Sequence, residues 1–198
     1  MPQLTHRSDR RYIPTMGALT IELPPQRTQT AFNLRRWSEL LRDPELAKIE
    51  GRVETDRYGR VIMSPPPAAS HGSYQFQIGA LLDRSMRSGR VLTECPISTA
   101  DGVRAADVAW ASPERMQELG ELACFPRAPE ICVEVLSPGN TAAEIREKSA
   151  LYFDAGAKEV WHCSVSGAMT FLAVGDAGHS PLTASRLCPD FPAKVNLR

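Results

Sequence analysis

The sequence of 198 residues has no apolar run long enough to cross a bilayer, and its first residues lack the hydrophobic segment of a signal peptide. We therefore expect a cytoplasmic protein without a membrane partner. It also lacks an excess of charge of either sign, because 23 basic residues balance 23 acidic ones. The overall field thus gives no argument for a polyanionic partner, although it does not exclude a local basic patch.

Paired cysteine spacing is missing as well. The five cysteines are odd in number and show no CxxC pattern, so we interpret them as reduced core residues. A zinc site that combines them with His162 or His179 is a minor alternative. A Cys or Ser nucleophile is disfavoured because the chain has no nucleophile elbow and because His162 and Cys163, adjacent on a predicted strand, face opposite sides.

Neither an internal repeat nor a low-complexity linker divides the chain. Residues 1–29 are rich in arginine and proline and have little apolar periodicity, which predicts a poorly ordered N-terminal extension. Residues 30–198 have the length of a single compact domain with a sizeable core.

Apolar periodicity and turn residues predict an α/β fold. The order of strand, turn, helix and strand over residues 130–161 predicts a crossover unit on a mixed or parallel sheet. Helices are expected at 31–42, from 68 to near 89, at 112–122 and at 141–153, and strands at 51–55, 60–64, 91–94, 103–110, 131–136, 158–161, 169–174 and 183–187.

The stretch 130–161 carries charged groups where hydrophobic packing is expected. Glu134 interrupts an apolar run, and a carboxylate in a buried strand needs a partner or a metal. Thr141 and Glu144 have the spacing of a capping box, with Asn140 as an alternative N-cap. On the helix that follows, Lys148 shares one face with Ile145, Ser149 and Tyr152.

Four more polar residues are candidates, each with an ordinary alternative. Asp107 lies among small apolar residues that would desolvate it, but a strand-edge acid facing water is equally consistent. Glu94 is a weaker case at the end of its strand. His71 opens the second helix on its apolar side, where a bond to backbone competes with a role in a site. Glu50 precedes a predicted hairpin, where an exposed acid is more common than a ligand.

Together these residues resemble the PD-(D/E)XK, or restriction-endonuclease-like, nucleases. More closely, the chain resembles the Uma-type putative restriction endonucleases of bacteria. The pattern of that family is an early glutamate, a helix-opening histidine, a strand aspartate, Glu-Val-Leu-Ser-Pro, and a helix lysine and tyrosine. The corresponding positions are Glu50, His71, Asp107, 134–138, Lys148 and Tyr152, and the resemblance spans roughly residues 30–175.

The resemblance implies a restriction-endonuclease-like core with a central mixed β-sheet flanked by helices. It also implies a metal-dependent endonuclease that hydrolyses phosphodiester bonds, with DNA as the expected partner. Hard oxygen ligands suit Mg²⁺ or Mn²⁺. The implied roles are metal binding by Asp107, Glu134 and the carbonyl of Val135, a water-mediated contact by Glu50, positioning of water or transition-state stabilisation by Lys148, and support by His71, Tyr152 and Glu94.

The sequence departs from this pattern at two positions. Ala106 stands where the family has proline, and Leu136 stands where the superfamily has a strand lysine, so Lys148 would supply that charge from the helix. The alternative function is a catalytically inactive module of the same fold that binds nucleic acid or a protein. By analogy with enzymes that cut both strands of a duplex, we expect a homodimer.

Overall fold

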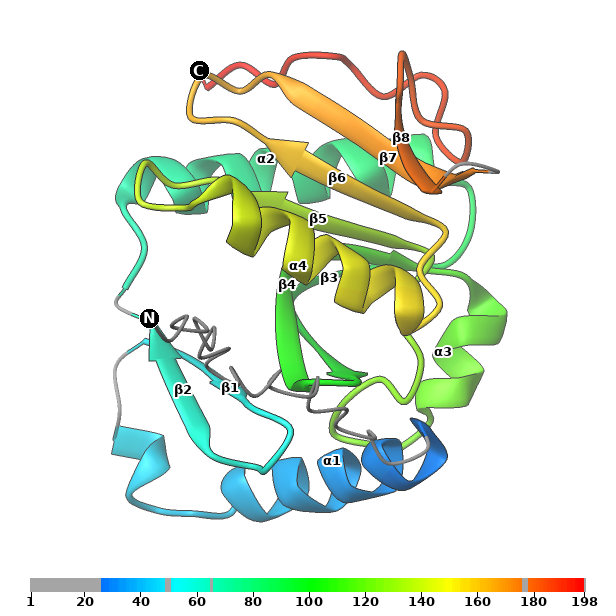
Figure 1. Ribbon diagram of the computed structural model, residues 1–198. Helices are drawn as coiled ribbons and strands as arrows, with labels where there is room; N and C mark the ends of the chain where they lie inside the picture. The colour runs from blue at the N-terminus through cyan, green and yellow to red at the C-terminus, as the bar shows by residue number, and fades with distance from the viewer. Residues whose placement is uncertain (1–25, 49–50, 65, 176–177, 198) are drawn as a thin grey trace, which may run out of the picture.

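The computed structural model describes residues 26–48, 51–64, 66–175 and 178–197. Four α-helices, one short 3-10 helix and eight strands make up these residues (Figure 1). In chain order they are α1 (Gln26–Leu40), η1 (Leu46–Lys48), β1 (Arg52–Thr55), β2 (Val61–Ser64), α2 (Ala69–Ser85), β3 (Arg90–Thr99), β4 (Gly102–Ala111), α3 (Pro113–Leu119), β5 (Ile131–Val135), α4 (Ala142–Asp154), β6 (Glu159–Cys163), β7 (Met169–Gly175) and β8 (Gly178–Leu182).

Six strands form one mixed sheet in the order β3-β4-β5-β6-β7-β8. The β5–β6 pair is parallel and its strands are connected through α4, whereas the other neighbouring pairs are antiparallel. Strands β1 and β2 form a separate antiparallel hairpin that contacts β4. The α/β class, the mixed sheet and the crossover unit are therefore confirmed.

Helices α2 and α4 cover opposite faces of the sheet (Figure 1). Val133 and Val135 of β5 belong to the core cluster that contains Ile78 and Leu82 of α2. Cys132 belongs instead to the cluster that contains Tyr152 of α4. Because side chains alternate along a strand, Glu134 lies on the α4 side. The cysteines Cys95, Cys124, Cys132, Cys163 and Cys188 are all buried and free, as core residues would be.

Helix α1 begins at Gln26, five residues before the predicted start. Polar contacts rather than apolar periodicity hold this end. The amide of Gln29 donates to Asn33 Oδ1 at 2.8 Å, and the amide of Asn33 donates to Ser98 Oγ and to the carbonyl of Thr99, both at 2.9 Å. The helix is thereby fixed to the β3–β4 hairpin. Residues 1–25 of the predicted extension lie outside the described residues.

Two further boundaries differ from the prediction by at least four residues, the end of α2 and the end of β3. Helix α2 ends at Ser85 rather than near Gly89, and the indole of Trp110 donates to the carbonyl of Ser88 in the connection that follows. Strand β3 continues through Pro96 to Thr99 instead of stopping at Glu94. Proline is tolerated there because β3 is the terminal strand in the order of the described sheet.

The strand predicted at 183–187 is wrong. These residues wrap around the buried carboxylate of Glu159, which accepts hydrogen bonds from Ser185 Oγ at 2.7 Å and from the backbone N–H groups of Arg186 and Leu187 at 2.7 and 3.0 Å. The last strand is β8, at residues 178–182. Three hydrogen bonds from this segment to a buried acid thus replace the β ladder that the sequence pattern predicts.

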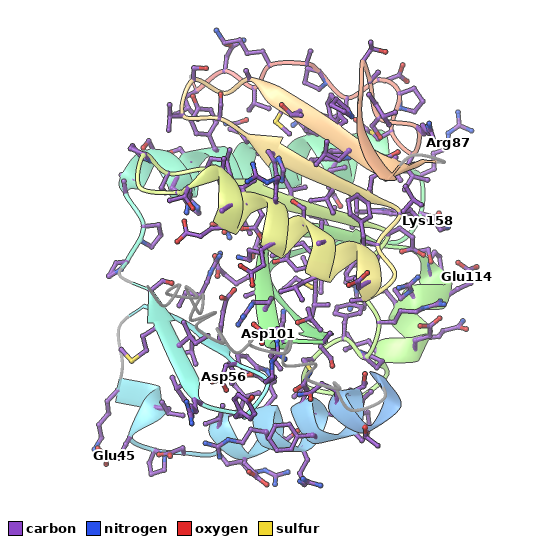
Figure 2. All side chains as sticks on the ribbon, viewed as in Figure 1. Glu45, Asp56, Arg87, Asp101, Glu114 and Lys158 are labelled. Carbon is purple, nitrogen blue, oxygen red and sulfur yellow. The ribbon has the colours of Figure 1, made fainter. Side chains whose placement is uncertain are left out.

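Charged side chains of both signs are spread around the molecule, as Glu45, Arg87, Glu114 and Lys158 illustrate (Figure 2). This distribution agrees with the balanced composition. Among the described residues, no helix has both the length and the apolar character needed to span a membrane.

Candidate active site

The candidate site lies where β4 and β5 separate. Their pairing runs from Trp110 opposite Ile131 to Val108 opposite Val133. One more residue in the same register would bring Asp107 opposite Glu134. At that point the N–H of Val135 donates to Asp107 Oδ2 at 2.6 Å, so a side chain takes the place of the ladder. Asp107 is only 1% exposed, and the water-facing alternative is therefore excluded.

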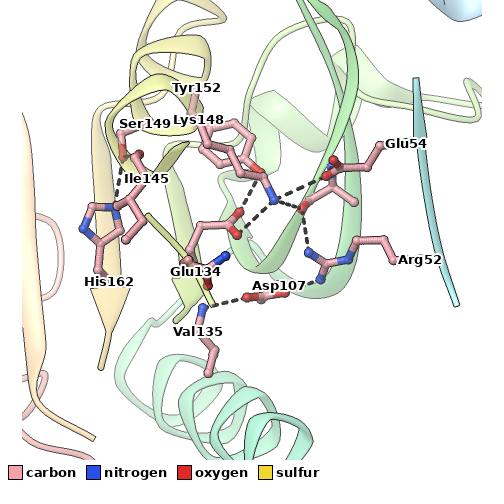
Figure 3. A network of polar contacts seen from close by, with 12 residues as sticks. Arg52, Glu54, Asp107, Glu134, Val135, Ile145, Lys148, Ser149, Tyr152 and His162 are labelled. Atoms are coloured by element: carbon pink, nitrogen blue, oxygen red, sulfur yellow. Dashed lines mark hydrogen bonds and ion pairs between the residues drawn. The ribbon is translucent and has the colours of Figure 1, made fainter. Parts of the chain in front are cut away.

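Helix α4 delivers two donors to the carboxylate of Glu134 (Figure 3). Lys148 Nζ donates to Glu134 Oε2 at 3.0 Å, and the hydroxyl of Tyr152 donates to Oε1 at 2.7 Å. Lys148 Nζ also lies 3.3 Å from Glu54 Oε1 and donates to the carbonyl of Ala105 at 3.1 Å. The shared helical face predicted for Lys148 and Tyr152 thus meets the strand glutamate.

The helix that presents these donors begins with the predicted capping box. The Thr141 hydroxyl accepts from the N–H of Glu144 at 3.2 Å, and the Glu144 carboxylate accepts from the N–H of Thr141 at 2.8 Å. This arrangement fixes the first turn, seven residues before Lys148.

Asp107 has two cationic or potentially cationic neighbours. The guanidinium of Arg52 donates to Asp107 Oδ1, and His71 Nε2 lies 3.3 Å from Oδ2. The Nδ1 atom of His71 is buried, and within the described part of the chain it has no hydrogen-bond partner. His71 therefore faces the site from the start of α2, as the resemblance implies.

Glu94 interrupts the β3–β4 ladder beside Asp107. Its φ of +50° makes it the non-glycine residue of the described chain with a left-handed backbone. The side chain of Gln75 donates both to the carbonyl of Asp107 and to Glu94 Oε1, each at 2.9 Å. The Glu94 carboxylate also accepts two hydrogen bonds from Arg52, at 2.7 and 2.8 Å. Glu94 thus contacts the site through Arg52.

Three residues of this network were missed by the sequence reasoning: Arg52, Glu54 and Gln75. Arg52 and Glu54 are two apart on β1, so they point to the same side, and Gln75 lies one turn after His71 on α2. The sequence shows these spacings, but it does not show which face of β1 or of α2 is directed at the site. Glu50, the predicted early glutamate, lies outside the described residues, whereas Glu54 contacts Lys148.

Burial and neighbouring charge move the pKa values of the two carboxyl groups in opposite directions. Burial, reinforced by the negative charge of Asp107, raises the pKa of Glu134 to about 7 despite the proximity of Lys148. Burial also opposes ionisation of Asp107, but the contacts with His71 and Arg52 outweigh it and lower its pKa. The hydrogen bond to Asp107 raises the pKa of His71.

The pKa of Lys148 reflects two opposing effects. Burial alone would lower it, but the charges of Glu134 and Glu54 outweigh burial and raise it. Lys148 is therefore an ammonium group at neutral pH, with its charge directed at the site.

The network opens into a cleft of about 620 Å³. Its walls come from the hairpin, the start of α2, the central strands and the first half of α4. The acidic and basic residues that line it are Arg52, Glu54, His71, Glu94, Asp107, Glu134, Glu144 and Lys148. Such a cleft gives a polar ligand access to the buried carboxylates.

The donor set fits a hard divalent cation. Asp107 and Glu134 offer carboxylate oxygens from neighbouring strands, and Mg²⁺ is commonly held by one or two carboxylates together with waters. Within the described ranges, no three His, Cys, Asp or Glu side chains are grouped as a metal cluster. A cation here would therefore rely on two acidic ligands.

Comparisons with known proteins identify the family and the fold of the chain. A solved structure described as a putative nuclease belonging to DUF820, from Anabaena variabilis ATCC 29413, has a TM-score of 0.63 at 16% identity and covers 80% of this chain and 93% of that chain. No curated protein matches the chain. The likeness shows that the chain shares the fold of that structure. Residues 37–172 match the family model Uma2, described as "Putative restriction endonuclease", and the chain belongs to that family.

Proposed function

We propose that the protein is a Mg²⁺- or Mn²⁺-dependent endonuclease that hydrolyses phosphodiester bonds in DNA. The observation that carries the proposal is that Asp107, Glu134 and Lys148 line one cleft, with Lys148 Nζ 3.0 Å from Glu134 Oε2. The description of the Uma2 family supports nuclease chemistry and favours DNA as the substrate.

Asp107, Glu134 and the backbone carbonyl of Val135 are the groups that would hold the cation. When bound, a divalent ion lowers the pKa of a water ligand and neutralises charge on the scissile phosphate. His71 and the N–H of Val135 orient the Asp107 carboxylate, and Tyr152 orients that of Glu134. These partners fix both acids in place before substrate arrives.

Lys148 contributes positive charge from the helix, where the strand itself has Leu136. The three N–H donors of its ammonium group face Glu134, the carbonyl of Ala105 and Glu54, so Lys148 orients a water molecule or stabilises the charge that develops on the phosphate by exchanging one of these acceptors. Glu54, 3.3 Å from Lys148 Nζ, restrains the position of this side chain from β1.

The test is a plasmid-nicking assay in Mn²⁺ that compares the parent protein with Lys148→Gln and Glu134→Gln. We expect both variants to lose cleavage by about a hundredfold or more, as for the loss of other transition-state stabilising groups. Lys158→Gln is a matched control, because this lysine is exposed just before β6. Circular dichroism checks that each variant is folded.

Cleavage by Lys148→Gln at the parental rate would contradict the proposed role of the lysine. Absence of cleavage by every protein, together with retention of DNA in a binding assay, would instead indicate the inactive binding module.

A further inference from the structure

Arg52 is the cation closest to Asp107, and no role in the proposed reaction uses it. Its side chain is 17% exposed, and its guanidinium donates to Asp107, to both oxygens of Glu94 and, at 3.3 Å, to the carbonyl of Ala105. The guanidinium is therefore held in place by four acceptor atoms (Figure 3 shows Arg52 beside Asp107).

Both oxygens of Asp107 already have protein partners. Arg52 lies on Oδ1, while Val135 and His71 approach Oδ2. A divalent cation on this carboxylate would place two positive centres within a few ångströms of each other in a buried site, where their repulsion is only weakly screened. The contact of Arg52 with Asp107 therefore opposes the binding of a divalent ion to the same carboxylate.

Glu94 offers Arg52 a second position. Its carboxylate binds the guanidinium through two parallel hydrogen bonds, and its side chain is 48% exposed on the outer side of the pair. The left-handed backbone of Glu94 and the contact from Gln75 fix this carboxylate. Arg52 can thus release Asp107 and remain paired with Glu94.

Resting on the proposed metal-dependent function, we propose that Arg52 is an internal competitor of the divalent ion for Asp107. It neutralises the buried carboxylate in the absence of the ion and thereby raises the concentration of Mg²⁺ or Mn²⁺ at which the site fills. Glu94 acts as the alternative acceptor that allows the exchange.

The experiment measures the dissociation constant for Mn²⁺ from the electron paramagnetic resonance signal of the free ion. Arg52→Gln should bind Mn²⁺ about tenfold more tightly or better, because a charge-assisted hydrogen bond to Asp107 no longer has to be broken. Arg127→Gln is the matched control and should bind as the parent does, because Arg127 pairs with Glu118 on the surface, at 2.5 Å. Glu94→Gln should bind more weakly than the parent, since Arg52 then has Asp107 as its main acceptor.

Asp107→Asn separates the two claims. If this variant loses Mn²⁺ binding while Arg52→Gln binds no more tightly than the parent, the competition is refuted and the metal site stands. If no protein binds Mn²⁺, or if Asp107→Asn binds as the parent does, the metal site and the competition both fail. Should Arg52→Gln not fold, Glu94→Gln decides: weaker binding supports the competition, and unchanged or tighter binding refutes it.

Discussion

The carboxylate of Glu134, on β5, is bound by two side chains of α4. Its two carboxylate oxygens accept from Lys148 and Tyr152, and burial still leaves its pKa at about 7. The ring of Tyr152 is fully buried, so its hydroxyl has little freedom to choose another partner. Lys148 and Tyr152 thus favour the ionised form of a glutamate whose ionisation burial opposes.

Tyr152→Phe keeps the buried ring and removes only the hydroxyl. We expect the free energy of unfolding to fall by about 1.5–3 kcal/mol, the range for hydrogen bonds to charged groups. Urea denaturation at pH 8 measures it. Tyr58→Phe, at an exposed tyrosine, is the control and should change nothing. Equal stability of Tyr152→Phe and the parent would show that the hydroxyl does not stabilise Glu134.

His162 of β6 lies opposite Glu134 of β5. The pKa of His162 is lowered, whereas that of His71 is raised. The Nε2 atom of His162 lies 2.9 Å from Ser149 Oγ, and burial lowers its pKa from the ordinary value of 6.5. The unfolded chain therefore takes up a proton below pH 6.5 before the folded protein does. The contribution of His162 to stability is complete above 6.5 and falls as the pH drops below it.

The raised pKa of His71 has the reverse effect, since its contribution is present below pH 6.5 and is lost as the pH rises through its folded value. The pH dependence of the free energy of unfolding of the parent protein alone would combine the contributions of His71 and His162. The difference in the free energy of unfolding between the parent and His162→Gln isolates His162. We expect this difference to favour the parent more at pH 8 than at pH 5, and a difference that is independent of pH would contradict the buried neutral imidazole.

The capping box of α4 links local sequence to the site, because it fixes the first turn of the helix that carries Lys148. Thr141→Ala should lower the free energy of unfolding by about 1 kcal/mol, the usual cost of losing an N-cap. Thr141→Ser keeps the accepting oxygen and should behave as the parent does. Both are measured by urea denaturation, and an unchanged midpoint for Thr141→Ala would show that the cap is dispensable.

Elements with strong local signals are those that could be predicted. The capping box of α4, the apolar run of β5 and the glycine turn between β1 and β2 each follow from a few adjacent residues. The segment 183–187 could not be predicted, because its conformation depends on Glu159, more than twenty residues earlier in the chain.

The candidate site also contains residues that could be predicted from the sequence and residues that could not. Asp107, Glu134 and Lys148 stand out because charge in an apolar setting is unusual, and the structure brings Glu134 and Lys148 together directly. Arg52 looks like an ordinary strand charge until its contacts with Glu94 and Asp107, 42 and 55 residues away, are known. The sequence alone contains no local signal for such long-range ion pairs.

For the molecule as a whole, two segments that are far apart in the chain line the same cleft. The hairpin of β1 and β2 supplies Arg52 and Glu54, and the crossover from β5 through α4 supplies Glu134 and Lys148. Because the net charge is balanced, affinity for the proposed DNA substrate would have to come from local basic groups rather than from the overall field. The homodimer expected for cleavage of both strands stays a prediction.

The most direct test of the central claim uses a phosphodiester without sequence information. Bis(p-nitrophenyl) phosphate reports phosphodiester hydrolysis as released p-nitrophenol, independently of any preferred DNA site. We expect release by the parent protein in Mn²⁺, loss of release with excess chelator, and loss in Glu134→Gln. Release that is equal in the parent and in Glu134→Gln, or no release by the parent in Mn²⁺, would contradict a metal-dependent phosphodiesterase site built on Asp107, Glu134 and Lys148.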